Sequence, residues 1–231
     1  MAISDRAIAS IQELILSGEL RPGSRLPTEN ELAAQLGVGR SSIREAVKAL
    51  EVIRVVDVRQ GDGTYVTSLE PHLLLERLGF AIDLVQDEAI LEIVEVRRLF
   101  EPIATGLAAK RIDDAAIAQL DACVANMEES GGDQEKLVHW DQRFHSTIIE
   151  ATGNRTLTSI LDGLAGRTVR ARIGRGVIEA EARQQTLRQH RAIHEALVAH
   201  DSRLAEAAAL LHVHTSEQWL RDLLGRSTAS E

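Results

Sequence analysis

The sequence predicts a mainly α protein in two parts, a small N-terminal unit that ends in a β-hairpin and an all-α antiparallel helical bundle. Three short helical patterns come first. Residues 55–66, "VVDVRQGDGTYV", then place β-prone residues on both sides of the turn sequence "QGDG", which is typical of a hairpin. After "TSLEPH" the chain is rich in alanine, leucine, glutamate and arginine, which favours helix. We therefore predict two domains, residues 1–68 and 69–231.

Length and composition favour a globular protein with a real core. The chain has 231 residues, of which 44% are hydrophobic and 26% charged. No apolar run approaches the length of a membrane span, and the start, "MAISDRAIAS", is charged where a secretory signal would be apolar. Cys123 is the single cysteine, so no disulfide framework exists. We expect a cytoplasmic protein with no membrane partner.

The net charge of −9 is unevenly distributed along the chain. Residues 1–67 hold 8 Lys/Arg against 9 Asp/Glu, whereas residues 68–231 hold 18 against 26. The acidity therefore lies mainly in the second part. A local basic face on the first part remains possible, so nucleic acid is not excluded as a partner.

Residues 26–51, "LPTENELAAQLGVGRSSIREAVKALE", predict two helices joined by a tight turn. Thr28 and Glu31 have the spacing of a capping box, which begins the first helix. Gly37 supplies the left-handed residue that ends it. The second helix begins at residues 39–40 and carries apolar residues on one side and polar, cationic residues on the other. This is the geometry of a helix-turn-helix.

In such a unit the second helix enters the major groove of DNA. Arg40 and Arg44 lie one turn apart near its start, where they can reach guanine edges or phosphates. The hairpin would be the wing of a winged helix-turn-helix. A helical hairpin with a solvated cationic face is the alternative, and the wing argues against it. The candidate DNA-binding residues are Arg40, Ser41, Ser42, Arg44, Lys48, Gly61 and Gly63.

The second part predicts seven helices. Their expected ranges are 71–84, 87–111, 114–129, 133–152, 156–173, 178–200 and 202–224.

Four potential metal ligands fall on these helices. Asp141 and His145 are four residues apart and share one helix face. Asp201 is a plausible N-cap between the last two helices. His190 lies 11 residues before it and His212 lies 11 after it. In an antiparallel pair with a rise of 1.5 Å per residue, both sit about 16 Å from the turn and can meet.

The motif "HRAIH", residues 190–194, has the histidine spacing of a zinc protease helix. Arg191 replaces the glutamate that would act as general base there. His194 lies level with Ala208, which cannot bind a metal. We expect ordinary surface or hydrogen-bonded roles for His72, His139, His194, His200 and His214.

One carboxylate and three imidazoles suit a divalent transition metal, foremost Zn²⁺, with Ni²⁺, Mn²⁺ or Fe²⁺ as alternatives. Three functions accommodate these features. The first is a ligand-responsive DNA-binding regulator, and the second is a metal-dependent enzyme built in a helical bundle. The third is a DNA-binding regulator whose bundle only dimerises. Because Arg191 occupies the position of the base and an enzyme leaves the DNA-binding head unexplained, we expect no enzyme.

A family resemblance supports the first function. "LRPGSRLPTENELAAQLGVGRSSIREAVKALE…VRQGDGTYV" resembles the winged helix-turn-helix of GntR-type bacterial transcription regulators over residues 3–67. The family contacts to DNA would fall on Arg40, Ser41, Arg44 and the wing tip at Gly61 to Gly63. Such regulators are expected to bind a palindromic operator of double-stranded DNA as a homodimer.

Two positions depart from the family pattern. Asn30 stands where the family often has an arginine that contacts DNA. Arg54 stands where the family usually has a glycine before the first wing strand, so it either strains that corner or adds a phosphate contact.

The helical part is similar to the effector-binding domain of the FadR subgroup over residues 73–222. The resemblance rests on "VRRLFE" at 96–101, "DQRFHSTIIEATGN" at 141–154, and "HRAIHEAL" at 190–197 followed by His212. It implies metal ligands at Asp141, His145, His190 and His212, and a small carboxylic acid as effector. Repression relieved by that effector is the commoner family behaviour. The effector-binding candidates are Arg97, as a bidentate partner of the acid, with Asn154, Arg172 and Arg170 as weaker ones.

Overall fold

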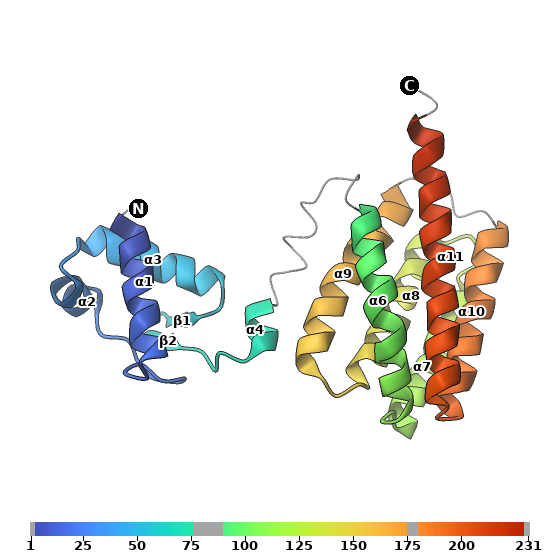
Figure 1. The fold of residues 1–231 in the computed structure, drawn as a ribbon, viewed down its shortest axis with the longest axis horizontal. Helices are drawn as coiled ribbons and strands as arrows, with labels where there is room; N and C mark the ends of the chain where they lie inside the picture. The colour runs from blue at the N-terminus through green and yellow to red at the C-terminus, as the bar shows by residue number, and fades with distance from the viewer. Residues whose placement is uncertain (1–2, 76–89, 175–179, 229–231) are drawn as a thin grey trace. The chain divides into compact units, whose positions relative to one another are not determined.

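The computed structural model describes residues 3–75, 90–174 and 180–228 (Figure 1). For the helical residues 165–174, 180–182 and 223–228 it describes the backbone alone. The chain divides into two compact units, Met1–Leu75 and Glu76–Glu231. The predicted mainly α class, with a two-stranded wing in the first unit and an all-helical second unit, is confirmed. The exact domain boundary at residue 68 stays a prediction.

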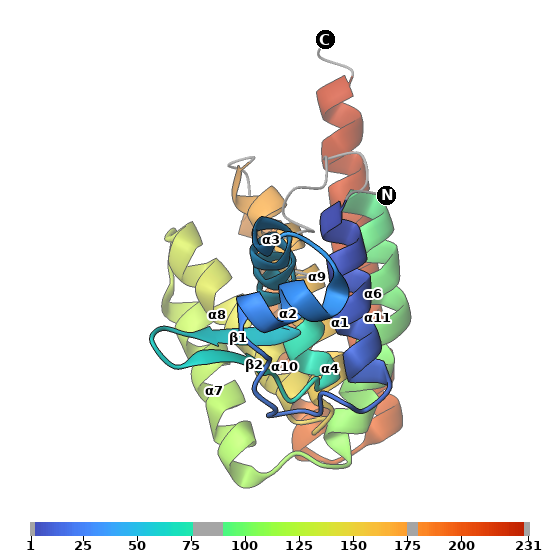
Figure 2. The ribbon, with the colours of Figure 1, turned by 90° about the vertical axis from the view of Figure 1, so that its left-hand side faces the viewer.

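The N-terminal unit packs three helices around one apolar core and adds a hairpin (Figure 2). Ile11, Leu32, Ile43 and Leu50 are among its fully buried side chains. The elements are α1 (Ile3–Leu16), α2 (Glu29–Leu36), α3 (Arg40–Val52), β1 (Val56–Arg59), β2 (Gly63–Val66) and the short α4 (Pro71–Leu75).

The turn between α2 and α3 forms as the sequence predicts. The Thr28 N–H donates to Glu31 Oε2 at 2.8 Å, and Thr28 Oγ1 accepts from the Glu31 N–H at 3.3 Å, so the capping box is complete. Gly37 ends α2 with φ 64°, in the left-handed region that favours glycine. α3 then begins at Arg40, and the helix-turn-helix geometry is confirmed.

The wing is an antiparallel pair. Its register runs from Val56 opposite Val66 to Arg59 opposite Gly63. Arg54, just before β1, has φ 61° and therefore adopts the left-handed conformation, at a position where the family usually has glycine. A non-glycine residue is strained in that conformation.

The second unit is a helical bundle in which α6 and α11 run side by side (Figure 1). Its main apolar core includes Phe144, Leu120, Met127 and Leu197, all fully buried. The helices are α6 (Ile90–Ala109), α7 (Asp114–Glu129), α8 (Gln134–Glu150), α9 (Arg155–Gly174), α10 (Ala180–Val198) and α11 (Ser202–Thr228). These bounds agree with the predicted ranges to within a few residues. The predicted helix at 71–84 is described as far as Leu75, and its remainder lies outside the described residues.

The hairpin of α10 and α11 sets the register on which the site depends. Asp201 Oδ1 accepts from the Leu204 N–H at 3.0 Å, so the predicted N-cap of α11 is confirmed. His200 turns the chain with φ 51°, and its Nδ1 lies 2.9 Å from the Ala109 carbonyl. Ser202 Oγ donates to the carbonyl of Gly106 at 2.7 Å. This contact ties the start of α11 to α6.

Candidate functional site

The outward side of α3 is cationic. Ile43, Ala46, Val47 and Leu50 are buried in the N-terminal core, whereas the polar side of the helix faces solvent. Ser42 is half-buried. The exposed residues include Arg40, Ser41, Arg44 and Lys48, together with Glu45 and Glu51. This arrangement leaves the candidate base and phosphate contacts of the helix accessible to a partner.

Arg44 is held by a residue that sequence reasoning missed. Its Nε lies 3.1 Å from Glu29 Oε1 and its Nη2 lies 2.8 Å from Glu29 Oε2, a bidentate pair that joins α3 to α2. The hydrogen bond lowers the pKa of Glu29 and raises the pKa of Arg44. Arg44 is exposed and Glu29 is partly exposed, so the pair contributes orientation more than stability. No sequence signal reveals it, because the contact depends on how α2 packs on α3.

Two further cations, Arg25 and Arg59, lie at the wing. Gly61 is exposed with φ 78°, and Gly63 has φ 146°. A Cβ on Gly63 would lie 2.7 Å from Arg25 Nε, and Arg25 donates to the carbonyl of Asp62. The Arg59 guanidinium carbon lies 4.2 Å from the ring centre of Tyr65. The sequence did not single out Arg25 or Arg59.

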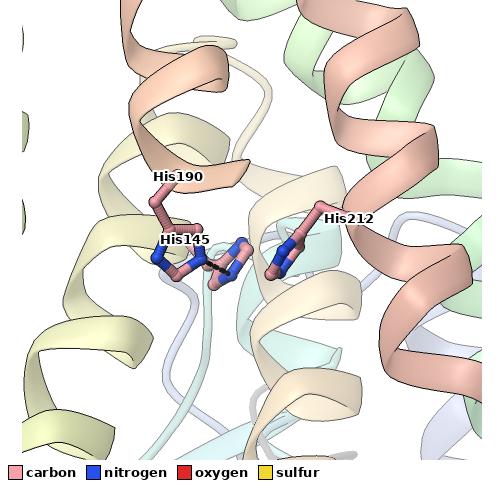
Figure 3. A group of neighbouring side chains, drawn as sticks. All are labelled: His145, His190 and His212. Carbon is pink, nitrogen blue, oxygen red and sulfur yellow. Dashed lines mark hydrogen bonds between the residues drawn. The ribbon is translucent and has the colours of Figure 1, made fainter. Parts of the chain in front are cut away.

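In the bundle, three histidines from three helices meet (Figure 3). His145 comes from α8, His190 from α10 and His212 from α11. One ring nitrogen of each lies within 4.8 Å of the others. The ring centres of His190 and His212 are 4.6 Å apart, so the predicted meeting across the α10–α11 hairpin is observed. His190 and His212 are buried, and His145 is half-buried.

The fourth proposed ligand lies beside this group. Asp141 is one turn before His145 on α8 and is buried. Its Oδ1 lies 3.5 Å from His190 Nε2. The structure thus brings together the three proposed imidazole ligands, and places the carboxylate of Asp141 beside one of them, His190.

The spacing of the donors fits one divalent ion. Nε2 of His190 lies 3.3 Å from Nε2 of His145. Two nitrogens bound to one tetrahedral Zn²⁺ at about 2.05 Å would be roughly 3.3 Å apart. The Asp141 separation from His190 is of the same order. The His145–His190 pair therefore matches the spacing of such a site, and the neighbouring side chains supply donors of the right chemistry.

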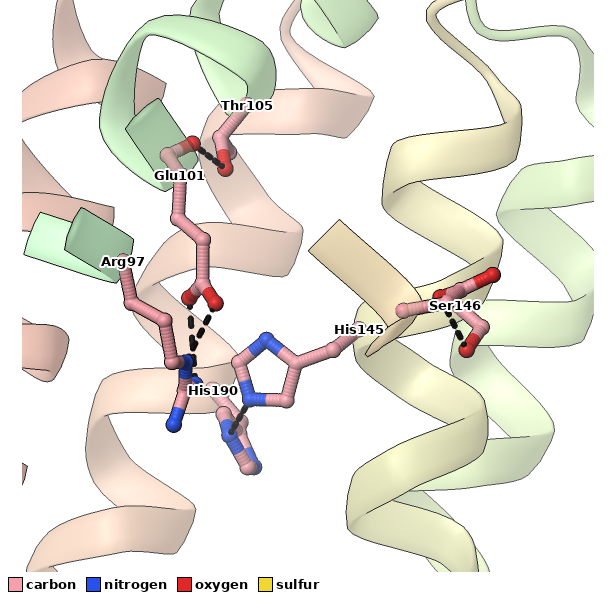
Figure 4. A network of polar contacts seen from close by, with 7 residues as sticks. Arg97, Glu101, Thr105, His145, Ser146 and His190 are labelled. Atoms are coloured by element: carbon pink, nitrogen blue, oxygen red, sulfur yellow. Dashed lines mark hydrogen bonds and ion pairs between the residues drawn. The ribbon is translucent and has the colours of Figure 1, made fainter. Parts of the chain in front are cut away.

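Arg97 lies close to the histidines and is paired (Figure 4). Its Nε is 2.5 Å from Glu101 Oε1 and its Nη2 is 3.2 Å from Glu101 Oε2, and both side chains are buried. Burial opposes the charge of Arg97, but Glu101 and then Asp141 favour it, and the net effect raises the pKa of Arg97. Glu101, one turn after Arg97, was not anticipated.

The structure describes the side chain of Asn154, another effector-binding candidate, but not the side chains of Arg170 and Arg172. Asn154 is exposed, and its Oδ1 accepts from the Leu157 N–H at 3.1 Å, which caps α9. These contacts place it at a helix start and not among the histidines. Arg170 and Arg172 lie in the last part of α9, where side chains are outside the described residues.

The remaining histidines stay apart from the group of three. Nε2 of His194 lies 3.0 Å from Asp121 Oδ1, and Nδ1 of His72 lies 3.1 Å from Glu70 Oε2. His139 and His214 are exposed. In the motif "HRAIH", Arg191 Nη2 lies 2.6 Å from Glu128 Oε1 at the surface. The motif therefore contributes His190 alone to the group.

A winged helix-turn-helix joined to a helical domain with a buried polar site defines a bacterial transcription regulator with an effector-binding domain. The chain belongs to the GntR family of bacterial regulatory proteins. Residues 3–66 match the model "Bacterial regulatory proteins, gntR family", and residues 92–215 match the "FCD domain". The second match agrees with the FadR subgroup.

Similar proteins match this chain along most of their length. The transcriptional regulator LutR of Bacillus subtilis is 29% identical over 211 residues, covering 90% of this chain and 96% of LutR. The galactonate operon transcriptional repressor of Escherichia coli is 27% identical over 224 residues, covering 95% and 97%. The solved structure of Streptococcus agalactiae GntR is 31% identical with a TM-score of 0.62, covering 93% and 99%.

These domains and relatives are those of transcription regulators and not of enzymes. The alternative of a metal-dependent enzyme is therefore set aside. Among the described residues, no helix is both long and apolar enough to cross a membrane.

Proposed function

We propose that this chain is a ligand-responsive regulator that binds a palindromic operator as a homodimer and responds to a small carboxylic acid held beside a divalent metal ion. Zn²⁺ is the first choice of metal, with Ni²⁺, Mn²⁺ and Fe²⁺ as alternatives. The convergence of His145, His190 and His212 in the bundle, with Asp141 beside His190, carries this proposal. We propose that it acts in the cytoplasm, where its DNA target lies.

The DNA-binding half of the proposal is supported by the exposed cationic side of α3 and by the wing. Arg40 and Arg44 would reach base edges or phosphates, and Ser41, Ser42 and Lys48 would contact the backbone. Two-fold symmetry of a homodimer would match a palindromic operator. Gly61 and Gly63 would let the wing approach the duplex closely. We propose that the protein represses transcription, since one relative is named as a repressor.

The metal half is supported by the donor set. Asp141 and the three histidines would hold the ion, and a bound ion would offer its remaining positions to a carboxylate oxygen. Arg97, on neighbouring α6, would meet the acid group of the effector from its guanidinium edge. Arg172 remains a weaker candidate for contact with that acid, whereas Asn154 caps α9 away from the histidines. A sugar acid is a reasonable first probe, because one relative controls a galactonate operon.

The effector can change DNA affinity only by binding one arrangement of the protein more tightly than another. A purely dimerising bundle would have no such preference. Its histidines would be structural, and removal of metal would change nothing.

The test combines metal analysis with a screen of acids. Purified protein is expected to carry stoichiometric metal that is lost from the double variant His190→Ala/His212→Ala. Small hydroxy acids and sugar acids, galactonate included, are then screened for a shift in melting temperature and for release of operator DNA. If the parent protein holds no metal after incubation with Zn²⁺, Ni²⁺ and Mn²⁺, the metal half of the proposal is wrong. The alternative of a bundle that only dimerises then stands.

A further inference from the structure

A chain of three hydrogen bonds connects His212 to the backbone of its own helix. His212 Nδ1 lies 3.2 Å from Gln189 Oε1. Gln189 Nε2 donates to Thr215 Oγ1 at 2.8 Å. Thr215 Oγ1 donates to the carbonyl of Leu211 at 2.9 Å. Gln189 is half-buried and immediately precedes His190 in α10, so it crosses from one ligand-bearing helix to the other.

The direction of these bonds follows from the Thr215 hydroxyl. In the structure this hydroxyl donates its single proton to the Leu211 carbonyl, which can only accept. Thr215 Oγ1 must then accept from Gln189, which requires the NH₂ group of the amide to face Thr215. The amide oxygen of Gln189 consequently faces His212. Because the Gln189 oxygen can only accept a hydrogen bond, Nδ1 of His212 must be the donor and therefore carries the proton.

A neutral imidazole with its proton on Nδ1 has its lone pair on Nε2. A metal ion can be bound only through a nitrogen that has no proton. We infer that Gln189, oriented by Thr215, is a positioning residue that holds His212 in the tautomer whose Nε2 can bind a metal ion. The inference rests on the proposed metal site. It adds the residue that prepares one ligand before the ion arrives.

The competing explanation is an ordinary hydrogen bond between α10 and α11. Such a bond would affect stability but would not select a tautomer. In proteins that do bind metals, loss of a residue that holds the second nitrogen of a histidine ligand weakens metal binding by about 10–100-fold. The two explanations therefore predict different behaviour of metal affinity and of the imidazole proton.

Three variants separate them. Gln189→Leu removes the acceptor. Gln189→Glu keeps an acceptor for His212, because a carboxylate oxygen accepts from Nδ1–H while the Thr215 hydroxyl can turn to donate to the other oxygen. Gln185→Leu makes the same chemical change at an exposed position of the same helix and is the matched control.

The affinity for Zn²⁺ is measured by competition with a chromophoric chelator on the full chain after removal of metal. We expect Gln189→Leu to bind Zn²⁺ about 10–100-fold more weakly, and Gln189→Glu and Gln185→Leu to stay within about threefold of the parent. Equal affinity of Gln189→Leu and parent would overturn the inference while leaving the metal site standing. Failure of the parent to bind Zn²⁺, Ni²⁺ or Mn²⁺ would overturn the proposed site and this inference together.

A second measurement needs no metal. Nitrogen-15 spectra of the metal-free protein, labelled at histidine, distinguish the two tautomers, and His212→Gln assigns the resonance. We expect the proton on Nδ1 of His212 in the parent and in Gln189→Glu, and a substantial population on Nε2 in Gln189→Leu. A parent protein with the proton on Nε2 would contradict the inference directly.

Discussion

Nε2 of His190 faces Nε2 of His145 at 3.3 Å, although the two rings come from different helices, α10 and α8. Two nitrogen lone pairs at this distance repel unless a proton or a cation lies between them. His212 and Asp141 adjoin the same pair. One of the two nitrogens can donate a proton to the other, and under the proposed function a metal ion would take the place of that proton.

Removal of metal is expected to lower the melting temperature of the protein. An ion that binds the folded state selectively stabilises it, by about 2.7 kcal/mol at a concentration 100 times its Kd. This corresponds to roughly 5–10 °C for a domain of this size. Thermal denaturation with Zn²⁺ and with EDTA measures the difference. The double variant His190→Ala/His212→Ala is the control and should melt at the same temperature in both; an equal EDTA effect on that variant would contradict the assignment.

The register of this site was predictable because it depends on local signals. Asp201 is a recognisable N-cap, and equal spacing on either side of it places His190 and His212 level in any antiparallel helix pair. Asp141 and His145 share a face by their spacing alone. The pairing of α8 with that hairpin came from family resemblance and not from spacing.

Partners that depend on tertiary packing could not be predicted. Glu29 reaches Arg44 only because α2 lies against α3, and Gln189 reaches Thr215 across two helices. Glu101 is four residues after Arg97, a spacing that allows an ion pair, but nothing in the sequence shows that both are buried. Nothing in the sequence marks a neutral or acidic residue of this kind as a partner, so its contact with a predicted site residue cannot be predicted from the sequence alone.

Glu29→Gln is expected to reduce the discrimination between operator and random DNA. The bidentate pair holds the guanidinium of Arg44 in one orientation, which favours base recognition over general phosphate binding. Loss of the negative charge should also strengthen non-specific binding. We expect the ratio of the two affinities to fall several-fold in fluorescence anisotropy titrations at fixed salt. Glu13→Gln, on the exposed side of α1, is the matched control, and an unchanged ratio in Glu29→Gln would argue against an orienting role.

Arg44→Ala is expected to weaken operator binding by about 1–3 kcal/mol, the usual contribution of a bidentate base contact. Arg203→Ala, which removes an exposed arginine from α11, should leave operator affinity unchanged. The two variants are compared by gel shift at one salt concentration, with metal content as a check on folding. Retained operator affinity in Arg44→Ala would mean that α3 is not the recognition helix.

Arg54→Gly tests whether Arg54, at the corner before the wing, only strains the backbone or also contacts DNA. Glycine relieves the left-handed strain, worth about 1–2 kcal/mol, but adds entropy to the unfolded chain, worth about 0.4–1 kcal/mol. A small gain in the stability of the N-terminal unit is therefore expected in urea denaturation. If Arg54 serves only the fold, operator affinity and its salt dependence stay the same; a weaker, less salt-dependent complex would identify a phosphate contact instead.

Asp162→Asn is expected to stabilise the bundle near neutral pH. Burial raises the pKa of Asp162 above its ordinary 3.8, although a hydrogen bond from Ser146 opposes the shift. The folded state therefore keeps this proton to a higher pH than the unfolded chain, and stability falls as the pH rises through that window. The neutral amide should gain at most about 1 kcal/mol at pH 7, because the site is partly exposed.

The check on Asp162 is the pH dependence of its effect. The advantage of Asp162→Asn should shrink as the pH falls toward 4, whereas Asp222→Asn, at an exposed position of α11, should show no such trend. Melting curves are recorded in EDTA so that metal binding does not contribute. An advantage that is the same at every pH would show that charge is not its cause.

The most direct test of the metal centre is an anomalous-difference map from crystals grown with excess Zn²⁺ and measured at the zinc absorption edge. We expect one strong peak per chain within about 2.0–2.2 Å of Asp141 and of ring nitrogens from His145, His190 and His212. Crystals that contain zinc only at other places, or none at all, would contradict the account.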